Sequence, residues 1–348
     1  MDISIGDKII GKDAPVFVIA EAACNHMCDL GLAKQMIDEA AKAGADSIKF
    51  QTYKAEKLVT DKAVAFWGDE KVSQLEYYKR LDRFGKSDYL ELFDYAESKG
   101  IIPFSSPFDS ENATMLNDIG MKVFKIASCE IPNLEFIRHV AKMGKPIILS
   151  TGAASEAEIE DAVDAIKAEG NEQLMLLACT LSYPTANNNA NIRRIQTLKQ
   201  LYPDTTIGFS DHTEPEPNMV IPALAVAMGA RIVEKHYTLD RSMTGSGHFF
   251  AVSPDDLSRM VYNIRLAEQV LGDGKLGIAE SEAEAWHSAR RSIVANQSID
   301  AGVKIERAML SMKRPGSGLP FSALPEIVGR IAAKKIGKDQ VIESGMFE

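Results

Sequence analysis

One unit recurs along the chain, in which a short apolar run leads into a polar turn and then into an amphipathic segment. Such runs are typical of strands buried on both faces. Alternation of strands and helices implies parallel pairing through right-handed crossovers. The eight strands predicted in this way are Val16–Ala20, Ser47–Gln51, Ile101–Ser105, Val123–Ile126, Pro146–Ser150, Leu174–Cys179, Thr206–Ser210 and Arg231–Lys235.

Most segments between these strands are predicted to be helices. Leu32–Ala43 carries an apolar stripe with helical spacing, and Gly44 follows it as a C-cap signal. Ser155 is an expected N-cap for Glu156–Glu169. The same reasoning predicts helices at Tyr89–Ser98, Leu134–Met143, Met219–Met228 and Pro254–Leu271.

Eight strand–helix units favour a closed (β/α)8 TIM barrel over residues 1–272. The alternative, an open doubly wound sheet, is disfavoured because no Gly-x-Gly-x-x-Gly turn follows the first strand. Residues 273–288 are rich in Gly and Glu and are predicted to be a linker. Residues 289–348 are predicted to form a small, mostly β domain, which is near the lower size limit for an independent core.

The longest gap between strands lies at Thr52–Ser87. Its Trp67, Tyr77 and Tyr78 are consistent with an ordered flap over the barrel mouth or with a long surface loop.

Composition excludes several classes of protein. Lys and Arg total 39 and Asp and Glu total 49, a formal net charge of −10, which argues against non-specific nucleic-acid binding. No uninterrupted apolar run has the length of a membrane span, and the start does not resemble a signal peptide. Four cysteines are too few for a disulfide scaffold. We therefore expect a cytoplasmic enzyme that contacts neither nucleic acid nor membrane.

Two histidines follow the last two predicted strands. The carboxyl ends of barrel strands meet at one mouth, so His212 and His236 are expected to point into the same opening. Two imidazoles there suit a divalent transition metal, with Asp211 and Glu234 as further ligands or as groups that orient the histidines. The alternative is that each histidine caps its strand.

Lys49 and Lys125 end the second and fourth predicted strands. Lysines in a barrel mouth bind anions or form Schiff bases, although a lysine stem can also simply line the barrel. Hydroxyls nearby predict a phosphate or carboxylate cradle. These hydroxyls belong to Ser105, Ser106, Ser128, Ser150 and Thr151.

Glu21 and Glu130 follow the first and fourth predicted strands. A carboxylate beside a metal and two lysines can hold or deprotonate a water, but it can equally be an ion-pair partner of a lysine. His248 lies in the loop after the eighth strand and is a further candidate for substrate contact.

Eight motifs in order resemble those of the sialic acid synthase family. They are Ala20–His26, Lys49–Thr52, Phe104–Phe108, Lys125–Glu130, Lys145–Gly152, Cys179–Thr185, Gly208–Thr213 and Glu234–Arg241. Lys313–Gly318 resembles a loop of the antifreeze-like (SAF) domain that ends these proteins.

The resemblance implies a metal-dependent condensation of phosphoenolpyruvate with an N-acetylated hexosamine, such as N-acetylmannosamine. The product would be a nine-carbon α-keto acid sugar, with phosphate leaving by C–O cleavage. It implies Mn²⁺, or else Mg²⁺ or Co²⁺, on His212 and His236. It implies that Glu21 and Gln51 build the metal and sugar end of the pocket. Phosphoenolpyruvate contacts would come from Lys49, Ser106, Lys125, Ser128, Ser150, Tyr183 and Ser210.

The resemblance further implies a homodimer in which the small domain of one chain covers the barrel of its partner. Arg314 would then reach the amino sugar in trans. Leu181 and Gly247 depart from the family's usual polar and acidic residues. The sugar therefore stays open among precursors of N-acetylneuraminic, legionaminic, pseudaminic or another nonulosonic acid.

Two alternatives from other classes remain. A Schiff-base aldolase would use Lys49 or Lys125 and would form a covalent adduct that borohydride traps. A non-enzymatic glycan-binding protein would have no use for two histidines and two lysines at strand ends.

Overall fold

The computed structural model describes residues 2–67 and 73–348. The chain divides into two compact units, Met1–Gly272 and Asp273–Glu348. Each unit has its own apolar core and is described by itself.

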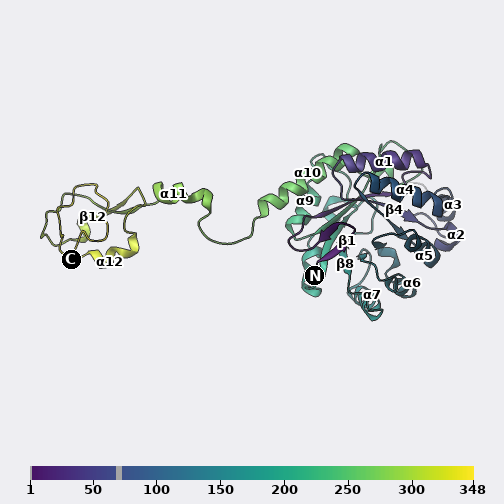
Figure 1. Ribbon diagram of the computed structural model, residues 1–348, viewed down its shortest axis with the longest axis horizontal. Coiled ribbons are helices and arrows are strands. Elements are labelled where there is room, and N and C mark those ends of the chain that lie inside the picture. The colour runs from purple at the N-terminus through teal and green to yellow at the C-terminus, as the bar shows by residue number, and fades with distance from the viewer. Residues whose placement is uncertain (1, 68–72) are drawn as a thin grey trace. The chain divides into compact units, whose positions relative to one another are not determined.

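The first unit contains a closed barrel of eight parallel strands (Figure 1). The barrel closes where β10 pairs with β3, with Ile232 opposite Phe17. This closure confirms the predicted TIM barrel and rules out the open sheet. The barrel strands are β3 (Phe17–Ala23), β4 (Ser47–Thr52), β5 (Ile102–Pro107), β6 (Phe124–Ile126), β7 (Ile147–Ser150), β8 (Leu174–Cys179), β9 (Thr206–Asp211) and β10 (Ile232–His236).

Helices surround the barrel and bury their apolar stripes against it. The Ser155 side chain accepts a hydrogen bond from the Glu158 backbone, which confirms the predicted cap. Gly44 ends the first of these helices with a φ of +84°, a conformation that favours glycine. The helices are α1 (Leu30–Lys42), α4 (Lys86–Ser98), α5 (Ser110–Asp118), α6 (Leu134–Ala141), α7 (Glu156–Ala168), α8 (Arg194–Leu201), α9 (Val220–Ala227) and α10 (Pro254–Leu271).

An amino-terminal hairpin that the sequence did not predict closes one end of the barrel. It pairs β1 (Ile3–Ile5) with β2 (Lys8–Ile10), and its isoleucines join the barrel core. Gly6 at its tip lies against Ile102, the first residue of β5. The hairpin therefore covers the end of the barrel where the strands begin, and the mouth is at the other end.

The long insertion after β4 is ordered over its described residues. It contains α2 (Ala55–Leu58) and α3 (Gln74–Lys79). Short 3₁₀ turns follow three of the strands, at η1 (Ser128–Glu130), η2 (Asn187–Asn189) and η3 (His248–Phe250). None of the described helices has the length and apolar character needed to cross a membrane.

The second unit is small and built mainly from extended segments. Its antiparallel pair joins β11 (Ser292–Ala295) to β12 (Leu310–Lys313), and isolated bridges such as Ile299–Ile336 extend the pairing. These elements confirm the predicted mostly β domain. Its helical turns are η4 (Glu280–Glu282), α11 (Ala283–Ser288), η5 (Arg307–Met309), η6 (Phe321–Ala323) and α12 (Leu324–Ile327).

Gly208 on β9 has no room for a side chain between the neighbouring strands, and it gives a first prediction. A Cβ at this position would lie 2.6 Å from the Ile232 carbonyl oxygen and 2.5 Å from Leu177. Gly208→Ala must therefore push two strands apart, and we expect it to destabilise the protein by about 1–3 kcal/mol. A lowered midpoint in thermal unfolding followed by circular dichroism would show this. Gly277→Ala is the matched control, because nothing lies within 4 Å of its added Cβ; equal midpoints for both variants would contradict the prediction.

Candidate active site

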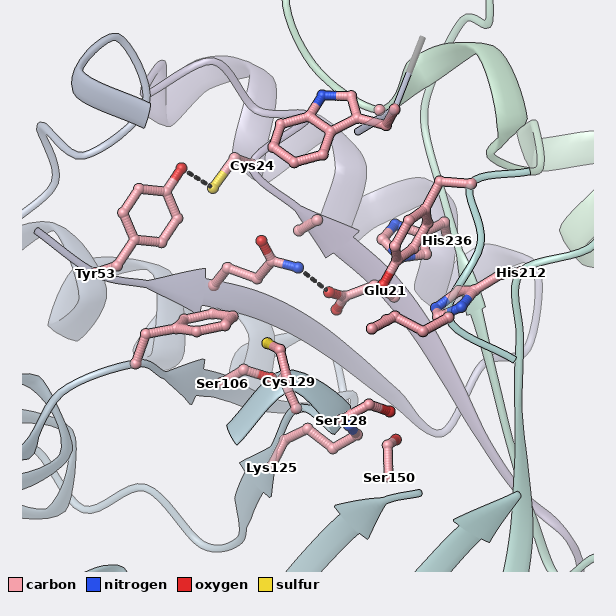
Figure 2. A pocket seen from close by; sticks show the side chains of 18 of the residues that line it. Glu21, Cys24, Tyr53, Ser106, Lys125, Ser128, Cys129, Ser150, His212 and His236 are labelled. Carbon is pink, nitrogen blue, oxygen red and sulfur yellow. Dashed lines mark hydrogen bonds between the residues drawn. The ribbon is translucent and has the colours of Figure 1, made fainter. Parts of the chain in front are cut away.

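A cavity of about 380 Å³ lies at the carboxyl ends of the barrel strands. Twelve of the residues predicted from the sequence line it together. Eight of them lie on seven of the barrel strands, and the other four follow the end of a strand within four residues. Figure 2 shows several of them around one space. The twelve are Glu21, Lys49, Gln51, Ser106, Lys125, Ser128, Glu130, Ser150, Tyr183, Ser210, His212 and His236. We call these twelve residues, together with Glu234, the floor.

A buried ion cluster forms the centre of the floor. The Lys49 ammonium lies 3.0 Å from a Glu21 oxygen and 3.4 Å from a Glu234 oxygen, and it donates to Ser106 at 3.1 Å. Burial raises the pKa of the Glu21 carboxyl to about 7, although Lys49 opposes this. Burial alone would lower the pKa of Lys49, but the two carboxylates outweigh it and the pKa is raised. Lys49 is therefore held as a cation.

Lys125 is buried with weaker compensation. Its nearest carboxylate oxygen, on Glu234, is 3.9 Å away, and its hydrogen bond goes to the Ile126 carbonyl at 3.2 Å. Burial lowers the pKa of Lys125. The Ser150 hydroxyl, another floor group, is buried without a hydrogen-bond partner. A buried cation near an unpartnered hydroxyl is what an anion-binding site offers before its ligand arrives.

The two predicted histidines are neighbours on the same floor. Their ring centroids lie 5.3 Å apart, and the Tyr183 ring lies 4.3 Å from that of His212. The Nδ1 atom of His212 is 2.9 Å from the Thr180 carbonyl, whereas the Nδ1 atom of His236 is buried without a partner.

These histidines fit a divalent metal with few protein ligands. Burial and the neighbouring His212 hold the pKa of His236 well below its usual value, so its imidazole is neutral and able to ligate. Burial alone would lower the pKa of His212, but the neighbouring Cys179 sulfur and the bond to the Thr180 carbonyl outweigh it, and the pKa is raised. No cluster of three or more metal-binding side chains occurs among the described residues. A metal held here would therefore take its remaining ligands from water or substrate.

Gln51 and Glu130 also belong to the floor, and each bonds a neighbouring side chain. Gln51 donates to Glu21 at 3.0 Å, and Figure 2 shows the Glu21 carboxylate that receives this bond. Glu130 accepts from the Asn133 side chain at 3.0 Å, and burial raises the pKa of its carboxyl. Neither lysine has Glu130 among its ion-pair partners in the described chain. Glu130 is therefore not the lysine partner that the sequence left open as an alternative.

Four predicted site residues do not line the cavity. Ser105 and Thr151 are buried outside it, because the pleat turns successive side chains of a strand to opposite faces and Ser106 and Ser150 face inward. Ser105 bonds Thr52 at 2.6 Å, and Thr151 donates to the Leu177 carbonyl at 3.0 Å. His248 is fully buried, with its Nδ1 atom 2.7 Å from the Thr238 hydroxyl. Arg314 is exposed in the second unit.

Glu234 has a larger role in the floor than the sequence analysis predicted, where it was a possible metal ligand or a group that orients the histidines. It compensates both lysines and accepts from Ser210 at 2.9 Å. Its pKa is lowered by Lys125 and Lys49, although burial opposes this. The signal was present, because Glu234 lies two residues before His236 and a strand turns alternate residues to the same face.

The other side of the cavity is lined from the insertion and from loops beyond the strands. We call this set the roof. Its aromatic rings are in contact, with Trp67 lying 5.3 Å from Tyr77 and 4.8 Å from Phe66. The insertion is therefore a flap over the mouth, one of the two interpretations that the sequence allowed. The described roof residues are Leu58, Val59, Phe66, Trp67, Gln74, Tyr77, Tyr78, Leu81, Phe108, Leu181, Ser246, Gly247 and Phe250.

Comparison with known families gives two matches. Residues 36–276 match the NeuB family, and residues 290–348 match the SAF domain. Together the matches cover the barrel from α1 onward and nearly all of the extended part of the second unit.

Individual relatives are similar over most of their length. An N,N'-diacetyllegionaminic acid synthase of Campylobacter jejuni is 37% identical, covering 93% of this chain and 98% of that protein. The N-acetylneuraminate-9-phosphate synthase of Mus musculus is 33% identical, covering 94% and 90%. The solved N-acetylneuraminic acid synthetase of Leptospira borgpetersenii is 41% identical with a TM-score of 0.75, covering 82% of this chain and 95% of that one.

Two buried lysines allow a test of which charges belong to the site. Lys235 lies 2.7 Å from Asp211 outside the cavity, so Lys235→Met strands a buried carboxylate and should cost about 3–5 kcal/mol. Lys125→Met removes a poorly compensated cation and should leave stability unchanged or raise it. Thermal unfolding of both variants measures the difference. Equal destabilisation by the two substitutions would mean that Lys125 has a structural role.

Proposed function

The chain belongs to the NeuB family, and on this premise we propose that it condenses phosphoenolpyruvate with an N-acetylated hexosamine. It is an enzyme of the nonulosonic acid synthase class, a transferase that joins two substrates. The observation that carries the finer proposal is the convergence of Lys49, Lys125, His212 and His236 on one cavity. The two lysine cations can bind the anionic phosphoenolpyruvate. The two imidazoles beside them can hold a metal that polarises the sugar carbonyl.

The floor holds phosphoenolpyruvate through charge and hydroxyl groups. Lys125 and Lys49 face the phosphate and carboxylate, and hydroxyls complete the cradle. The lining hydroxyls are those of Ser106, Ser128, Ser150 and Ser210. Ser128 accepts a hydrogen bond from the Gly152 backbone at 2.9 Å, which fixes its oxygen in place, and its hydroxyl hydrogen is the donor that it can offer to an anion.

The reaction forms one carbon–carbon bond and breaks one carbon–oxygen bond. C3 of phosphoenolpyruvate bonds to the aldehyde carbon of the open-chain sugar, whose oxygen takes a proton. The oxygen of a water then bonds to C2, and the C2–O bond to phosphate breaks as the water oxygen becomes the keto oxygen. Of the two protons of the water, one ends on the former aldehyde oxygen and the other on phosphate. Glu21, with a pKa of about 7, is placed to accept the proton that this water loses. The roof excludes bulk water from the intermediate.

His212 and His236 would hold the divalent metal, which we propose to be Mn²⁺, or else Mg²⁺ or Co²⁺. When bound there, it supplies Lewis-acid polarisation of the sugar aldehyde. Their neighbours keep the two rings in place, since Tyr183 and Phe250 contact His236 at ring distances of 5.8 and 4.8 Å. None of the four cysteines forms a disulfide, which supports the proposal that the reaction takes place in the reducing cytoplasm.

We further propose that the chain acts as a homodimer in which the second unit of one chain covers the cavity of its partner. Arg314 is exposed and directly follows Lys313, the last residue of β12. An exposed guanidinium on such a lid would bind the hydroxyl or amide oxygens of the sugar.

Release of phosphate from phosphoenolpyruvate and an N-acetylated hexosamine tests the reaction. With ¹⁸O in the bridging position of phosphoenolpyruvate, we expect the label in the released phosphate, since the C2–O bond breaks.

His236→Ala should lower kcat by at least about a hundredfold. Chelation followed by Mn²⁺ should abolish and restore turnover of the unsubstituted enzyme. His139→Ala is the control, because His139 lies outside the cavity, with its Nε2 atom 3.0 Å from the Thr114 hydroxyl and 3.1 Å from the Ser110 carbonyl. Turnover that survives both chelation and His236→Ala would contradict the metal role.

The covering domain gives a separate prediction. Arg314→Ala should raise the KM for the sugar about tenfold or more and leave the KM for phosphoenolpyruvate nearly unchanged. Arg330→Ala, another exposed arginine of the second unit, is the control. Mixing Arg314→Ala chains with His236→Ala chains should restore part of the activity, because one of the two sites is then intact. Absence of such restoration, with mixed dimers present, would contradict action in trans.

A further inference from the structure

His212 and His236 lie just beyond the last paired residues of two neighbouring strands. The pairing of β9 with β10 ends with Lys235 opposite Asp211, and the two histidines are the residues that follow. Both are labelled in Figure 2, which shows them on the same side of the cavity. The register of the two strands is therefore fixed only up to the residue before each histidine, and the separation of the imidazoles depends on contacts beyond the pairing.

The backbone of each histidine is bonded to a different segment. The His212 carbonyl accepts from the Thr185 backbone at 2.8 Å, in the loop after β8. The His236 carbonyl accepts from the Val252 backbone at 2.8 Å, in the loop after β10, and His236 lies opposite Glu21 of β3. These bonds tie the two histidines to different parts of the barrel and not to each other.

One buried ammonium joins the two segments. Lys235 donates to the Asp211 carboxylate at 2.7 Å, and to the carbonyl and the hydroxyl of Thr213 at 2.8 and 3.2 Å. Asp211 and Thr213 are the residues on either side of His212. Lys235 directly precedes His236. The three bonds use all three protons of the ammonium, so one side chain beside one histidine grips both neighbours of the other.

Asp211 also closes a tight turn around His212. Its second carboxylate oxygen accepts from the Thr213 backbone at 2.8 Å, so the residues before and after His212 are bonded to each other. Lys235, Asp211 and Thr213 are each at most 2% exposed. Water therefore does not compete for these bonds, and the low local dielectric strengthens them. We call these three residues the bracket.

The separation of the two imidazoles is the main geometric term that the protein can give to a metal here. No group of three or more potential ligands occurs over residues 2–67 and 73–348, so a third side chain does not correct a misplaced histidine. A functional ligand must be held within about 0.5 Å of its working position. The Thr180 carbonyl, 2.9 Å from Nδ1 of His212, orients the ring, whereas the bracket fixes the backbone that carries it.

Resting on the proposed metal role of the two histidines, we propose that Lys235 and Asp211 are positioning residues that set the separation of His212 and His236 for a divalent cation. Neither Lys235 nor Asp211 lines the cavity, so neither contacts a substrate there. Loss of the bridge between them should weaken metal binding and leave the contacts to phosphoenolpyruvate unchanged.

Removal of both charges separates positioning from stability. In Asp211→Asn with Lys235→Met, the amide oxygen can still accept from the Thr213 backbone, and no buried charge is left unpaired, so the double variant should be more stable than Lys235→Met alone. Titration of Co²⁺ into the metal-free full-length enzyme, followed by the absorption of the bound ion, measures a Kd without turnover. We expect the Kd to rise about tenfold or more and the absorption bands to shift.

The matched control is Lys34→Met with Glu91→Gln, which removes an ion pair of 2.6 Å between α1 and α4, outside the cavity, and should leave the Kd unchanged. In the bracket variant, turnover should recover as the Mn²⁺ concentration is raised, and the KM for phosphoenolpyruvate should not change. If this variant does not fold, Thr213→Val decides, because it removes only the bond of 3.2 Å and should raise the Kd about threefold.

The outcomes distinguish this inference from the proposed function. An unchanged Kd and unshifted bands in the folded double variant, or in Thr213→Val where the double variant does not fold, overturn the positioning role and leave the proposed function intact. Co²⁺ that fails to bind the unsubstituted enzyme, or that binds His236→Ala equally well, overturns the proposed metal role itself.

Discussion

Compensation of buried charge at the barrel mouth is the constraint on which the site depends. Lys49, Lys125, Glu21 and Glu234 are all less than 5% exposed, and two cations balance two carboxylates. Removing Lys49 would leave Glu21 and Glu234 without their closest cation in a poorly solvated place. An anion that enters the mouth meets Lys125 as the less engaged cation, because its nearest carboxylate oxygen is 3.9 Å away. Lys49 stays within 3.0 Å of Glu21 and 3.4 Å of Glu234. The cluster can therefore offer a cation to an anionic ligand while its closest ion pairs stay intact.

The fold was predictable from the sequence because two patterns are clear, the short apolar runs of the strands and the helical spacing of apolar residues between them. The barrel strands are short runs that are buried over nearly all their length, and most of the helices between them have an apolar stripe and a terminal glycine or N-cap. The closure of the sheet into a barrel was predicted from the number of strand–helix units, which is eight. The amino-terminal hairpin escaped prediction because Ile3–Ile5 and Lys8–Ile10 are too short for either period to show.

The site was predictable to the extent that the pleat of a strand could be followed. Residues before the strand end alternate, so Ser106 faces the cavity while Ser105 bonds Thr52 behind it. The same rule separates Glu234 and His236 from Lys235. Beyond the strand end the rule fails. Nothing in the periodicity distinguishes His248, which is buried under its own loop, from Phe250, which reaches the cavity.

Strand β10 shows how one short segment serves both stability and chemistry. Lys235 pairs with Asp211 and donates to the Thr213 carbonyl at 2.8 Å, so every charge on the outer face has a close partner. On the inner face Glu234 serves two lysines at 3.4 and 3.9 Å, and the Nδ1 atom of His236 has no partner. The outer arrangement is complete without a ligand, whereas the inner one leaves polar groups unsatisfied that substrates can satisfy. The loose geometry of the inner face is therefore what makes it a binding surface, and the tight pairs behind it hold that surface in place.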